Sequence, residues 1–310
     1  YSGVVAGQEL ATATAAPVFE TQVVGTTIEQ VVPAPHARID KVVRQHMFER
    51  RVVGLSVGVV KAGKATYLKG YGYEDREAEI PLIAQRSMLR WASISKPVTA
   101  TIAARLAREG AVDLEAPIQT YFKRYRAPRH HLIKCPKRAE ELQHEGKTLP
   151  CKKGYADVKL PKAERTVTLK RLLAHLSGVM GYGNGRGSAT PARKHWNNPK
   201  RNKGLTWGLK KVLRQPFGSK PGASYVYSTF GYNLAAVVLE EASGKDFPTL
   251  IQEEVAGPTG MTTVQPDYAW EEIPHRAAGY RKPKKKTELV RAKTLDVSWK
   301  MAGGGLISTT

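Results

Sequence analysis

The segment RWASISKPVTATIAARLAREG, from Arg90 to Gly110, places Ser93 three residues before Lys96 at the start of an expected helix. Residues three apart on a helix share a face, so the lysine amine can reach the serine hydroxyl. A helix N-terminus stabilises negative charge that develops on a serine oxygen, and a buried lysine with hydroxyl neighbours can accept a proton. The pair is therefore predicted to be a nucleophile with its base.

This spacing is weak evidence when it stands alone. The chain has 13 serines and 27 lysines among its 310 residues, so about one serine–lysine pair at this spacing is expected by chance. The alternative interpretation is a serine that begins a helix and is followed by a solvated lysine. The residues around the pair are needed to distinguish the catalytic interpretation from the structural one.

A second serine, Ser56, lies in the pattern G-x-S-x-G formed by Gly54–Gly58. In alpha/beta hydrolases this pattern forms a sharp turn between a strand and a helix. Here Ser56 lies inside an alternating apolar run, and a turn and a second strand are expected to follow it. We therefore interpret Ser56 as a strand residue.

Two kinds of element are expected before the serine–lysine pair. Residues 36–51 are expected to form a helix with one apolar face. VVGLSVGVV and ATYLKGYG are expected to be two strands around a turn at Lys61–Lys64 that contains Gly63. The apolar helical face consists of Ile39, Val42, Val43, His46 and Met47.

The helix that carries the pair has an apolar repeat, since Val98, Ile102 and Leu106 recur every four residues. Pro97 is tolerated only near a helix start, which puts Ser93 in or just before the first turn, and Gly110 is placed to end the helix. Four further elements are expected: a short helix over 166–175, a Pro-Gly turn with an extended piece over 220–233, a helix over 232–244, and a glycine-rich turn over 301–310.

Five motifs follow one another along the chain. They are W-A-S-I-S-K-P-V-T-A at 91–100, L-L-A-H-L-S-G at 172–178, P-G-A-S-Y-V-Y-S-T at 221–229, G-P-T-G-M-T at 257–262 and G-G-L-I-S-T at 304–309. Together they resemble the serine beta-lactamase-like family, which includes class C beta-lactamases, D,D-peptidases and esterases, over about residues 36–310. The match is closest to the serine beta-lactamase-like subgroup of animal mitochondria and bacteria. Five motifs in order are not explained by coincidence.

The resemblance implies an α/β (α+β) fold of the beta-lactamase/transpeptidase type, in which an antiparallel sheet with flanking helices carries a mainly helical subdomain. The expected organisation is a flexible arm over 1–35 and one domain over 36–310. Its parts are a first α/β part over 36–90, a mainly helical part over 91–290 with basic inserts at 121–165 and 191–214, and a return to the α/β part over 291–310.

The resemblance also assigns roles to residues of the site. Ser93 is the nucleophile that forms an acyl-enzyme, Lys96 is its proton acceptor, and Tyr227 is the second member of the proton relay. Thr229 takes the place where most of the family has a substrate-binding asparagine, and one hydroxyl cannot replace an amide's separate donor and acceptor. His175 is interpreted as a structural hydrogen-bonding residue, because no acid is placed behind its ring.

The family's third motif, Lys or His followed by Ser/Thr-Gly, is expected after the G-G-L-I-S-T segment. No such motif follows Ser308, so we expect that the C-terminal strands are missing. The motif completes the oxyanion hole, and losing one oxyanion donor lowers a rate by about 10²–10³-fold. The 310 residues alone are therefore expected to be poorly active.

The resulting hypothesis is a serine hydrolase that cleaves peptides, esters or cell-wall-like amides, with peptidase or esterase activity favoured over efficient beta-lactam turnover. The alternative is a weakly catalytic or non-catalytic scaffold of the same fold, which polymerises or binds an anionic envelope. No cofactor motif and no metal-ligand spacing is present in the sequence. No apolar run reaches the roughly 20 residues that span a bilayer.

The net charge of +22 is concentrated in three stretches. Residues 121–171 hold 15 Lys/Arg against 5 Asp/Glu, residues 191–214 hold 8 against none, and residues 281–293 hold 7 against 1. These stretches are interpreted as solvated insert loops, and the alternative is a patch for an anionic envelope surface. The basic runs lack interleaved aromatic residues, which disfavours nucleic acid as the partner. The oligomeric state is left open.

The two cysteines, Cys135 and Cys151, lie within the first basic stretch. They are expected to form a disulfide if the protein is exported and to be free thiols in a reducing compartment. The chain begins YSGVVAGQELATATAAP, a small and polar segment typical of what remains after a signal is removed. We therefore expect an exported protein, periplasmic or extracellular, or one of the mitochondrial intermembrane space if its source is eukaryotic.

Overall fold

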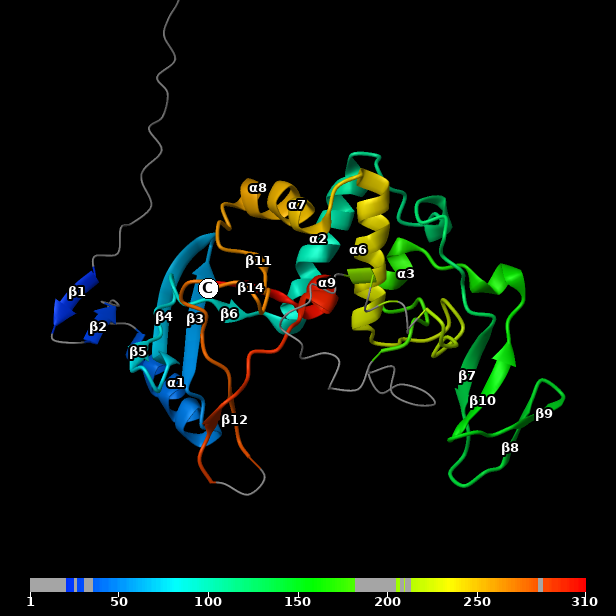
Figure 1. Cartoon of the computed structure of the whole chain (residues 1–310), viewed down its shortest axis with the longest axis horizontal. Helices are drawn as coiled ribbons and strands as arrows, with labels where there is room; N and C mark the ends of the chain where they lie inside the picture. The colour runs from blue at the N-terminus through cyan, green and yellow to red at the C-terminus, as the bar shows by residue number, and fades with distance from the viewer. Residues whose placement is uncertain are drawn as a thin grey trace, which may run out of the picture. The chain divides into compact units, whose positions relative to one another are not determined.

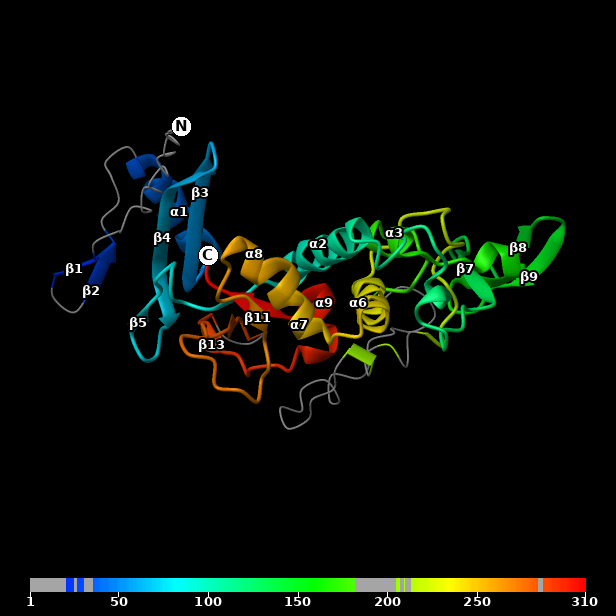
Figure 2. The ribbon, with the colours of Figure 1, turned by 90° about the horizontal axis from the view of Figure 1, so that it is seen from above.

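The computed structural model describes residues 21–24, 27–30, 36–181, 205–206, 209, 213–283 and 287–310. The chain divides into two compact units, with the boundary between Ala84 and Gln85. Figures 1 and 2 show the elements of each unit by their colours along the chain. Each unit is described by itself below.

The first unit contains one helix and two antiparallel sheets. Strands β1 (Thr21–Val24) and β2 (Thr27–Gln30) pair with each other, helix α1 spans Ala37–Arg50, and the second sheet has the order β3 (Gly54–Lys61), β4 (Lys64–Asp75) and β5 (Ile80–Pro81). The predicted hairpin is confirmed, and Gly63 in its turn has the positive φ that favours glycine. Ser56 pairs with Gly70 inside β3, so the strand interpretation of Ser56 is confirmed.

Helix α1 is confirmed in extent, but its predicted apolar face is too wide. Ile39, Val43 and Met47 are half-buried, whereas His46 is exposed and Val42 has an exposed fraction of 61%. The three half-buried residues recur every four positions and form one narrow stripe on the 3.6-residue period. Val42 and His46 lie beside that stripe, so including them in the face was wrong.

A polar cluster joins α1 to β4. Tyr71 donates a hydrogen bond to Asp40 at 2.7 Å, and Lys69 does so at 2.9 Å. Burial raises the pKa of the Asp40 carboxyl, but hydrogen bonds from Tyr71, Lys69 and Tyr67 outweigh it and lower this pKa to about 2. The charged carboxylate therefore ties the helix to the strand.

The second unit carries the segments that the sequence singles out for chemistry. Its helical segments are η2 (Ala92–Ile94), α2 (Ser95–Arg108), η3 (Ile118–Thr120), η4 (Lys162–Arg165), α3 (Leu169–Leu173), α6 (Thr229–Ser243), α7 (Phe247–Ile251), η5 (Gln252–Ala256), α8 (Gly257–Thr259), η6 (Ser298–Lys300) and α9 (Met301–Gly304). Its strands are β6 (Leu89–Arg90), β7 (His130–Lys134), β8 (Glu141–His144), β9 (Lys147–Pro150), β10 (Tyr155–Lys159), β11 (Gln265–Pro266), β12 (Tyr280–Arg281), β13 (Val290–Arg291) and β14 (Leu306–Ser308).

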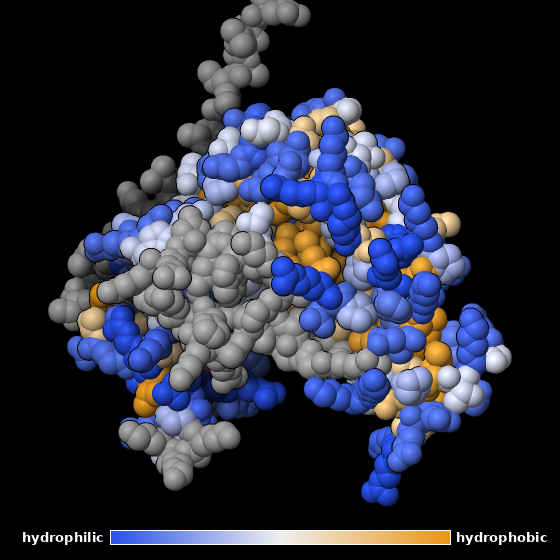
Figure 3. Space-filling view, turned by 45° about the vertical axis from the view of Figure 1, so that its right-hand side comes forward, coloured by the Kyte–Doolittle hydropathy of each residue, from blue (hydrophilic) through white to orange (hydrophobic). Residues whose placement is uncertain are grey.

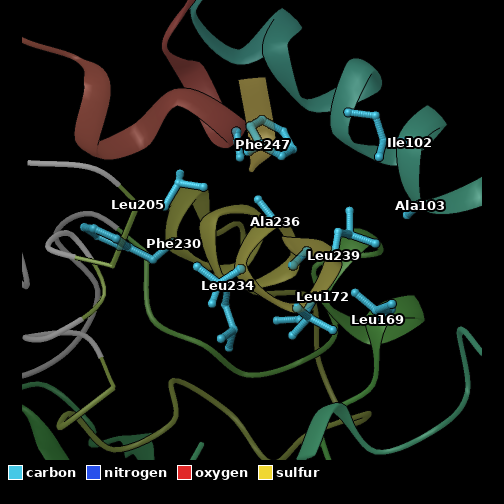
Figure 4. Close-up of a cluster of buried hydrophobic side chains, with 14 of the residues drawn as sticks. Ile102, Ala103, Leu169, Leu172, Leu205, Phe230, Leu234, Ala236, Leu239 and Phe247 are labelled. Carbon is cyan, nitrogen blue, oxygen red and sulfur yellow. The ribbon is translucent and has the colours of Figure 1, made fainter. Parts of the chain in front are cut away.

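The core of this unit is built around α6. This helix is apolar on nearly all sides from Thr229 to Leu239, as expected for a helix that is surrounded by protein. Helix α2 places Val98, Ile102 and Leu106 in the same core, which confirms the predicted apolar repeat. Figure 4 shows side chains of α2, α3, α6 and α7 gathered in this cluster. The core therefore fixes α2 and α6, the two helices whose N-termini carry the serine–lysine pair and the segment after Tyr227.

The elements predicted around the core are largely confirmed, with shifted ends. Gly110 follows α2 with a positive φ, and Gly244 ends α6 in the same conformation. Helix α6 begins at Thr229, three residues before the predicted start, because Ser228 caps it by accepting a hydrogen bond from the N–H of Gly231. The helix predicted over 166–175 is shorter, because Thr168 caps α3 immediately before Leu169.

The first basic insert, residues 121–165, is built largely of strands. Antiparallel pairs β7–β10 and β8–β9 form two ladders, and a disulfide joins Cys135 to Cys151. These strands lie in a part of the chain that was expected to be mainly helical. The second basic insert, 191–214, lies almost wholly outside the described residues. The remaining domain boundaries stay predictions.

Candidate active site

Ser93 lies in the short turn η2, immediately before α2. Its Oγ receives a hydrogen bond from Tyr227 Oη at 2.8 Å, and Lys96 Nζ lies 3.3 Å from the same oxygen. Ser93 is exposed, whereas Lys96 is buried. Ala92, the residue before the serine, has φ +47°, which non-glycine residues seldom adopt. The structure thus presents an accessible hydroxyl between a tyrosine and a buried lysine.

Lys96 has two kinds of protein partner besides Ser93. Its Nζ donates a hydrogen bond to the carbonyl oxygen of Gly303 at 2.5 Å. The same nitrogen lies 4.7 Å from the ring centroid of Tyr227 and 5.6 Å from that of Tyr232, distances at which a cation is attracted to a ring face. These contacts hold the lysine nitrogen beside the serine.

The Gly303 carbonyl is held in place by the close approach of α9 to two helices. A Cβ atom at Gly303 would lie 2.5 Å from Thr229 Cγ2 and 2.7 Å from the Thr229 carbonyl oxygen, so only glycine fits there. From α2, Thr99 donates a hydrogen bond to the Ala302 carbonyl at 2.7 Å, and Ser95 accepts one from the N–H of Leu306 at 3.1 Å. Hydrogen bonds at Ala302 and Leu306 therefore hold the glycine-rich segment on both sides of Gly303, whose carbonyl accepts from Lys96.

Tyr227 is positioned by the segment around His175. The N–H of Ser228 donates a hydrogen bond to His175 Nδ1 at 3.1 Å, and the N–H of Val226 donates one to the His175 carbonyl at 2.8 Å. The His175 ring also lies 4.5 Å from the Tyr227 ring. Burial, and secondarily the charge of Lys96, lowers the pKa of His175, so its Nδ1 stays free to accept.

The electrostatics of the site favour ionisation of Tyr227. Burial raises the pKa of this phenol, but hydrogen bonds with Lys96 and Ser93 and the positive charge of Lys96 outweigh it and lower the pKa below 10. Tyr225, two residues earlier, is 65% exposed and lies edge-on to the His175 ring. The two tyrosines differ in that Tyr227 contacts Ser93.

Thr229 lies behind this cluster. Only 3% of it is exposed, and its methyl group packs against Gly303 at the start of α6. The structure thus brings Ser93, Lys96 and Tyr227 together and buries Thr229 against the backbone that holds Lys96. The role of Thr229 in substrate binding stays a prediction.

Sequence reasoning missed the residues that hold the cluster from the side. Gly303 and Tyr232 contact Lys96, and the run G-G-G was a signal for a close backbone approach that was interpreted only as a turn. Lys300 was also missed. A Cβ atom built at Gly304 would have two neighbours: Lys300 Cδ at 3.8 Å and the carbonyl carbon of Ala92 at 3.5 Å. Lys300 and the residue before Ser93 therefore both lie close to Gly304. Burial, with the charges of Arg90 and Lys96, lowers the pKa of Lys300.

Among the described residues, no group of three or more His, Cys, Asp or Glu side chains is arranged to hold a metal ion. Within the same part of the chain, no helix combines the length and apolar character needed to cross a membrane.

The sequence profile of the family described as Beta-lactamase matches residues 39–310. The human protein "Serine beta-lactamase-like protein LACTB, mitochondrial" is 29% identical over 281 residues, which cover 83% of this chain and 51% of the human protein. "Esterase EstB" of Burkholderia gladioli is 28% identical over 228 residues, covering 73% of this chain and 50% of the esterase.

Among solved structures, the octameric penicillin-binding protein homologue from Pyrococcus abyssi superimposes with a TM-score of 0.65 at 23% identity, covering 88% of this chain and 53% of that one. This likeness confirms the beta-lactamase/transpeptidase-like α/β fold. The chain spans about half the length of the relatives it matches.

Proposed function

Because the chain belongs to the beta-lactamase family, whose relatives include an esterase and a penicillin-binding protein homologue, we propose that it is a serine hydrolase that works through an acyl-enzyme on Ser93. The observation that carries this proposal is the convergence of Tyr227 and Lys96 on one exposed serine hydroxyl, at 2.8 and 3.3 Å. Nucleophile and base within hydrogen-bond reach are the signature of covalent catalysis.

The proposed reaction has two halves. In the first, Ser93 Oγ attacks a carbonyl carbon while its proton passes to the Tyr227–Lys96 pair. The tetrahedral intermediate collapses when the bond to the leaving group breaks and the pair returns the proton to that group. In the second half, water attacks the acyl carbon and gives its proton to the pair, and the Ser93 oxygen leaves as a hydroxyl when the pair protonates it. The N-terminal end of α2 favours the negative charge that develops on the oxyanion.

The base is best described as the pair, because its two members share a hydrogen-bonded cluster. Lys96 holds a positive charge against the Tyr227 ring, and this charge helps to lower the pKa of the phenol. A phenolate that forms below its usual pH can take the serine proton at lower pH than an ordinary tyrosine. The buried lysine then stabilises the phenolate rather than acting on its own.

Esters and peptide-like amides are the proposed substrates, with efficient beta-lactam turnover disfavoured. Threonine at 229 is buried against Gly303 and cannot present both an amide donor and an amide acceptor to a substrate. We further propose that the protein is exported or lies in the mitochondrial intermembrane space. The Cys135–Cys151 disulfide supports this, since such bonds persist in oxidising compartments.

The test is intact-mass spectrometry of the protein at its natural length after incubation with an activated ester and, separately, with a penicillin. One stoichiometric adduct is expected, and Ser93→Ala should lose it. Ser56→Ala is the matched control, because it removes the other serine in a hydrolase-like pattern and leaves Ser93 intact. The decay rate of the adduct then measures deacylation for each probe.

Absence of an adduct with every acylating probe would reject the hydrolase proposal. It would favour the alternative from the sequence, a non-catalytic scaffold of the same fold that polymerises or binds an anionic envelope. In that case Ser93→Ala would leave the protein's assembly and surface binding unchanged.

A further inference from the structure

A pocket of about 720 Å³ opens in the second unit between two segments of the chain. The lining residues of one wall lie within 117–129, a segment that includes η3, and those of the other lie within 162–166, a segment that includes η4. The N–H of Ile118 donates to the Val167 carbonyl at 2.9 Å, and the N–H of Leu160 donates to the Arg129 carbonyl at 2.8 Å. Backbone hydrogen bonds thus tie the two walls together at both ends of the pocket.

The pocket is lined by four basic residues: Arg126, Arg129, Lys162 and Arg165. None of the described residues that line it is acidic. Cations gathered without a carboxylate repel one another, and an anion between them relieves that repulsion. Hydrophilic residues also predominate on the face that Figure 3 shows. Four of the 15 Lys/Arg residues in 121–171 therefore line a single pocket.

Two uncharged polar side chains, Tyr125 and Gln119, also belong to the pocket wall. The hydroxyl of Tyr125 and the Oε1 atom of Gln119 are buried and find no hydrogen-bond partner in the described part of the protein. Neither atom is exposed on the pocket surface, and Gln119 Oε1 is an acceptor like a phosphate oxygen. An anionic ligand would therefore be held by the basic side chains of the wall.

The arginines of the wall retain donors for a ligand. Arg126 Nη1 donates to the carbonyls of Lys123 and Tyr125 at 2.7 and 3.0 Å, and Arg165 Nε donates to the Pro161 carbonyl at 3.3 Å. Within the described residues, the other N–H groups of these two guanidinium groups make no hydrogen bond. Guanidinium groups bind phosphate oxygens in a planar, two-pronged manner that a lysine charge can supplement.

We propose that this pocket binds a compact ligand with more than one phosphate group. Its volume lies within the range of small-molecule sites, roughly 300–1,000 Å³, and four cations match several negative charges. The ligand is either a soluble polyphosphorylated molecule or the headgroup of an anionic lipid that carries several phosphates. The proposal does not depend on the hydrolase activity of Ser93, because no residue of the serine site lines the pocket.

The test is calorimetric titration of the protein with inorganic tripolyphosphate at about 150 mM salt, where weak surface attraction is screened. One saturable site per chain is expected. The double variant Arg129→Glu/Lys162→Glu should weaken the affinity about 10- to 100-fold, since it removes two charged contacts. Both side chains are exposed, and a thermal unfolding midpoint equal to the parent's shows that the fold is kept.

The matched control is Lys137→Glu/Lys147→Glu, which makes the same change in net charge at exposed positions of the same insert outside the pocket. Its affinity should stay within about threefold of the parent's. Equal weakening by both double variants, or no saturable binding, would overturn the proposal. Ser93→Ala should bind tripolyphosphate like the parent, which separates this test from that of the hydrolase.

A second arm identifies the source of the phosphate. Vesicles of phosphatidylcholine with a phosphatidylinositol bisphosphate are mixed with the protein and floated, with and without tripolyphosphate. Flotation that tripolyphosphate abolishes, and that the pocket variant lacks, supports the pocket and assigns a lipid headgroup. Tripolyphosphate binding without flotation supports the pocket and assigns a soluble ligand. Flotation that the pocket variant retains in full would contradict the pocket.

Discussion

The serine site and the basic pocket both gather polar side chains, but they differ in whether the protein itself satisfies them. Lys96 has the Gly303 carbonyl, the Ser93 hydroxyl and two aromatic rings around its nitrogen. The pocket has four cations and no lining carboxylate within the described chain.

This difference separates two kinds of site. Internal partners hold catalytic groups in one geometry before a substrate arrives, which is what preorganised catalysis requires. Unbalanced positive charge favours the binding of an anion. The serine site thus has its geometry fixed by the protein itself, whereas the charge of the basic pocket is balanced only when an anion binds.

Tyr227→Phe should have the largest effect on the serine site. Removing the phenol that contacts Ser93 should slow acylation by about 10²–10⁴-fold, the usual range for a general acid or base. Tyr225→Phe is the control, because Tyr225 lies on the same segment and beside the same histidine ring but does not contact Ser93. The rate of adduct formation by mass spectrometry checks both. Similar rates for the two variants would remove Tyr227 from the relay.

Gly303→Ala should have the next largest effect on the acylation rate. The added methyl group would clash with the Thr229 backbone and shift the carbonyl that holds Lys96, and a displacement of about 1 Å can slow a reaction about 10²-fold. Gly304→Ala is the control, since its nearest contact would be an ordinary 3.5 Å. Acylation rates and unfolding midpoints are measured for both. A Gly303→Ala enzyme with the parent's acylation rate would show that this close approach does not position the lysine.

The pH dependence of acylation should report the ionisation of Tyr227. A base acts only when it is deprotonated, and the pKa of Tyr227 is lowered, so the rate should rise with pH through an apparent pKa below 10. Because Lys96 helps to lower that pKa, Lys96→Met should move the rise to higher pH as well as slow the reaction. A stopped-flow series with an activated ester checks this. A rise at or above pH 10 in the parent would contradict the electrostatic account.

The double variant Cys135→Ser/Cys151→Ser should have the smallest effect on acylation, less than about twofold. The disulfide closes a segment with a sequence separation of 16 within residues 121–165, a stretch that contains none of Ser93, Lys96 and Tyr227. Loss of a link across about 15 residues destabilises what it joins by about 3 kcal/mol. Limited proteolysis should therefore cut the insert faster while acylation persists. Loss of acylation together with the insert would show that the two regions depend on each other.

Much of the serine site could be predicted from local sequence. The four-residue spacing of Val98, Ile102 and Leu106 determines which face of α2 is buried, and the position of Pro97 determines where the helix can start. The pair Ser93–Lys96 follows from the same helix geometry, because residues three apart share a face. The strand position of Ser56 likewise follows from the alternation of apolar residues around it.

The partners of that pair could not be predicted from physical patterns alone. Tyr227 lies 134 residues from Ser93, and Gly303 lies 207 residues from Lys96. Only the resemblance to a family indicated Tyr227. The G-G-G run indicates a close backbone approach, but it does not identify the Gly303 carbonyl as the acceptor of Lys96, because a backbone atom carries no residue-type signal. The structure places Thr229 at the start of α6 after the cap at Ser228, with 3% of it exposed, and its predicted role in substrate binding stays a prediction.

The charge of the first basic insert and the local pairing of Ser93 with Lys96 depend on residues that are close along the chain, so both could be read from the amino-acid order. That four of those charges surround a pocket, and that Tyr227 completes the serine site, depends on the folded chain. Periodicity and capping act within a few residues, whereas cavities and catalytic clusters form where distant segments pack together.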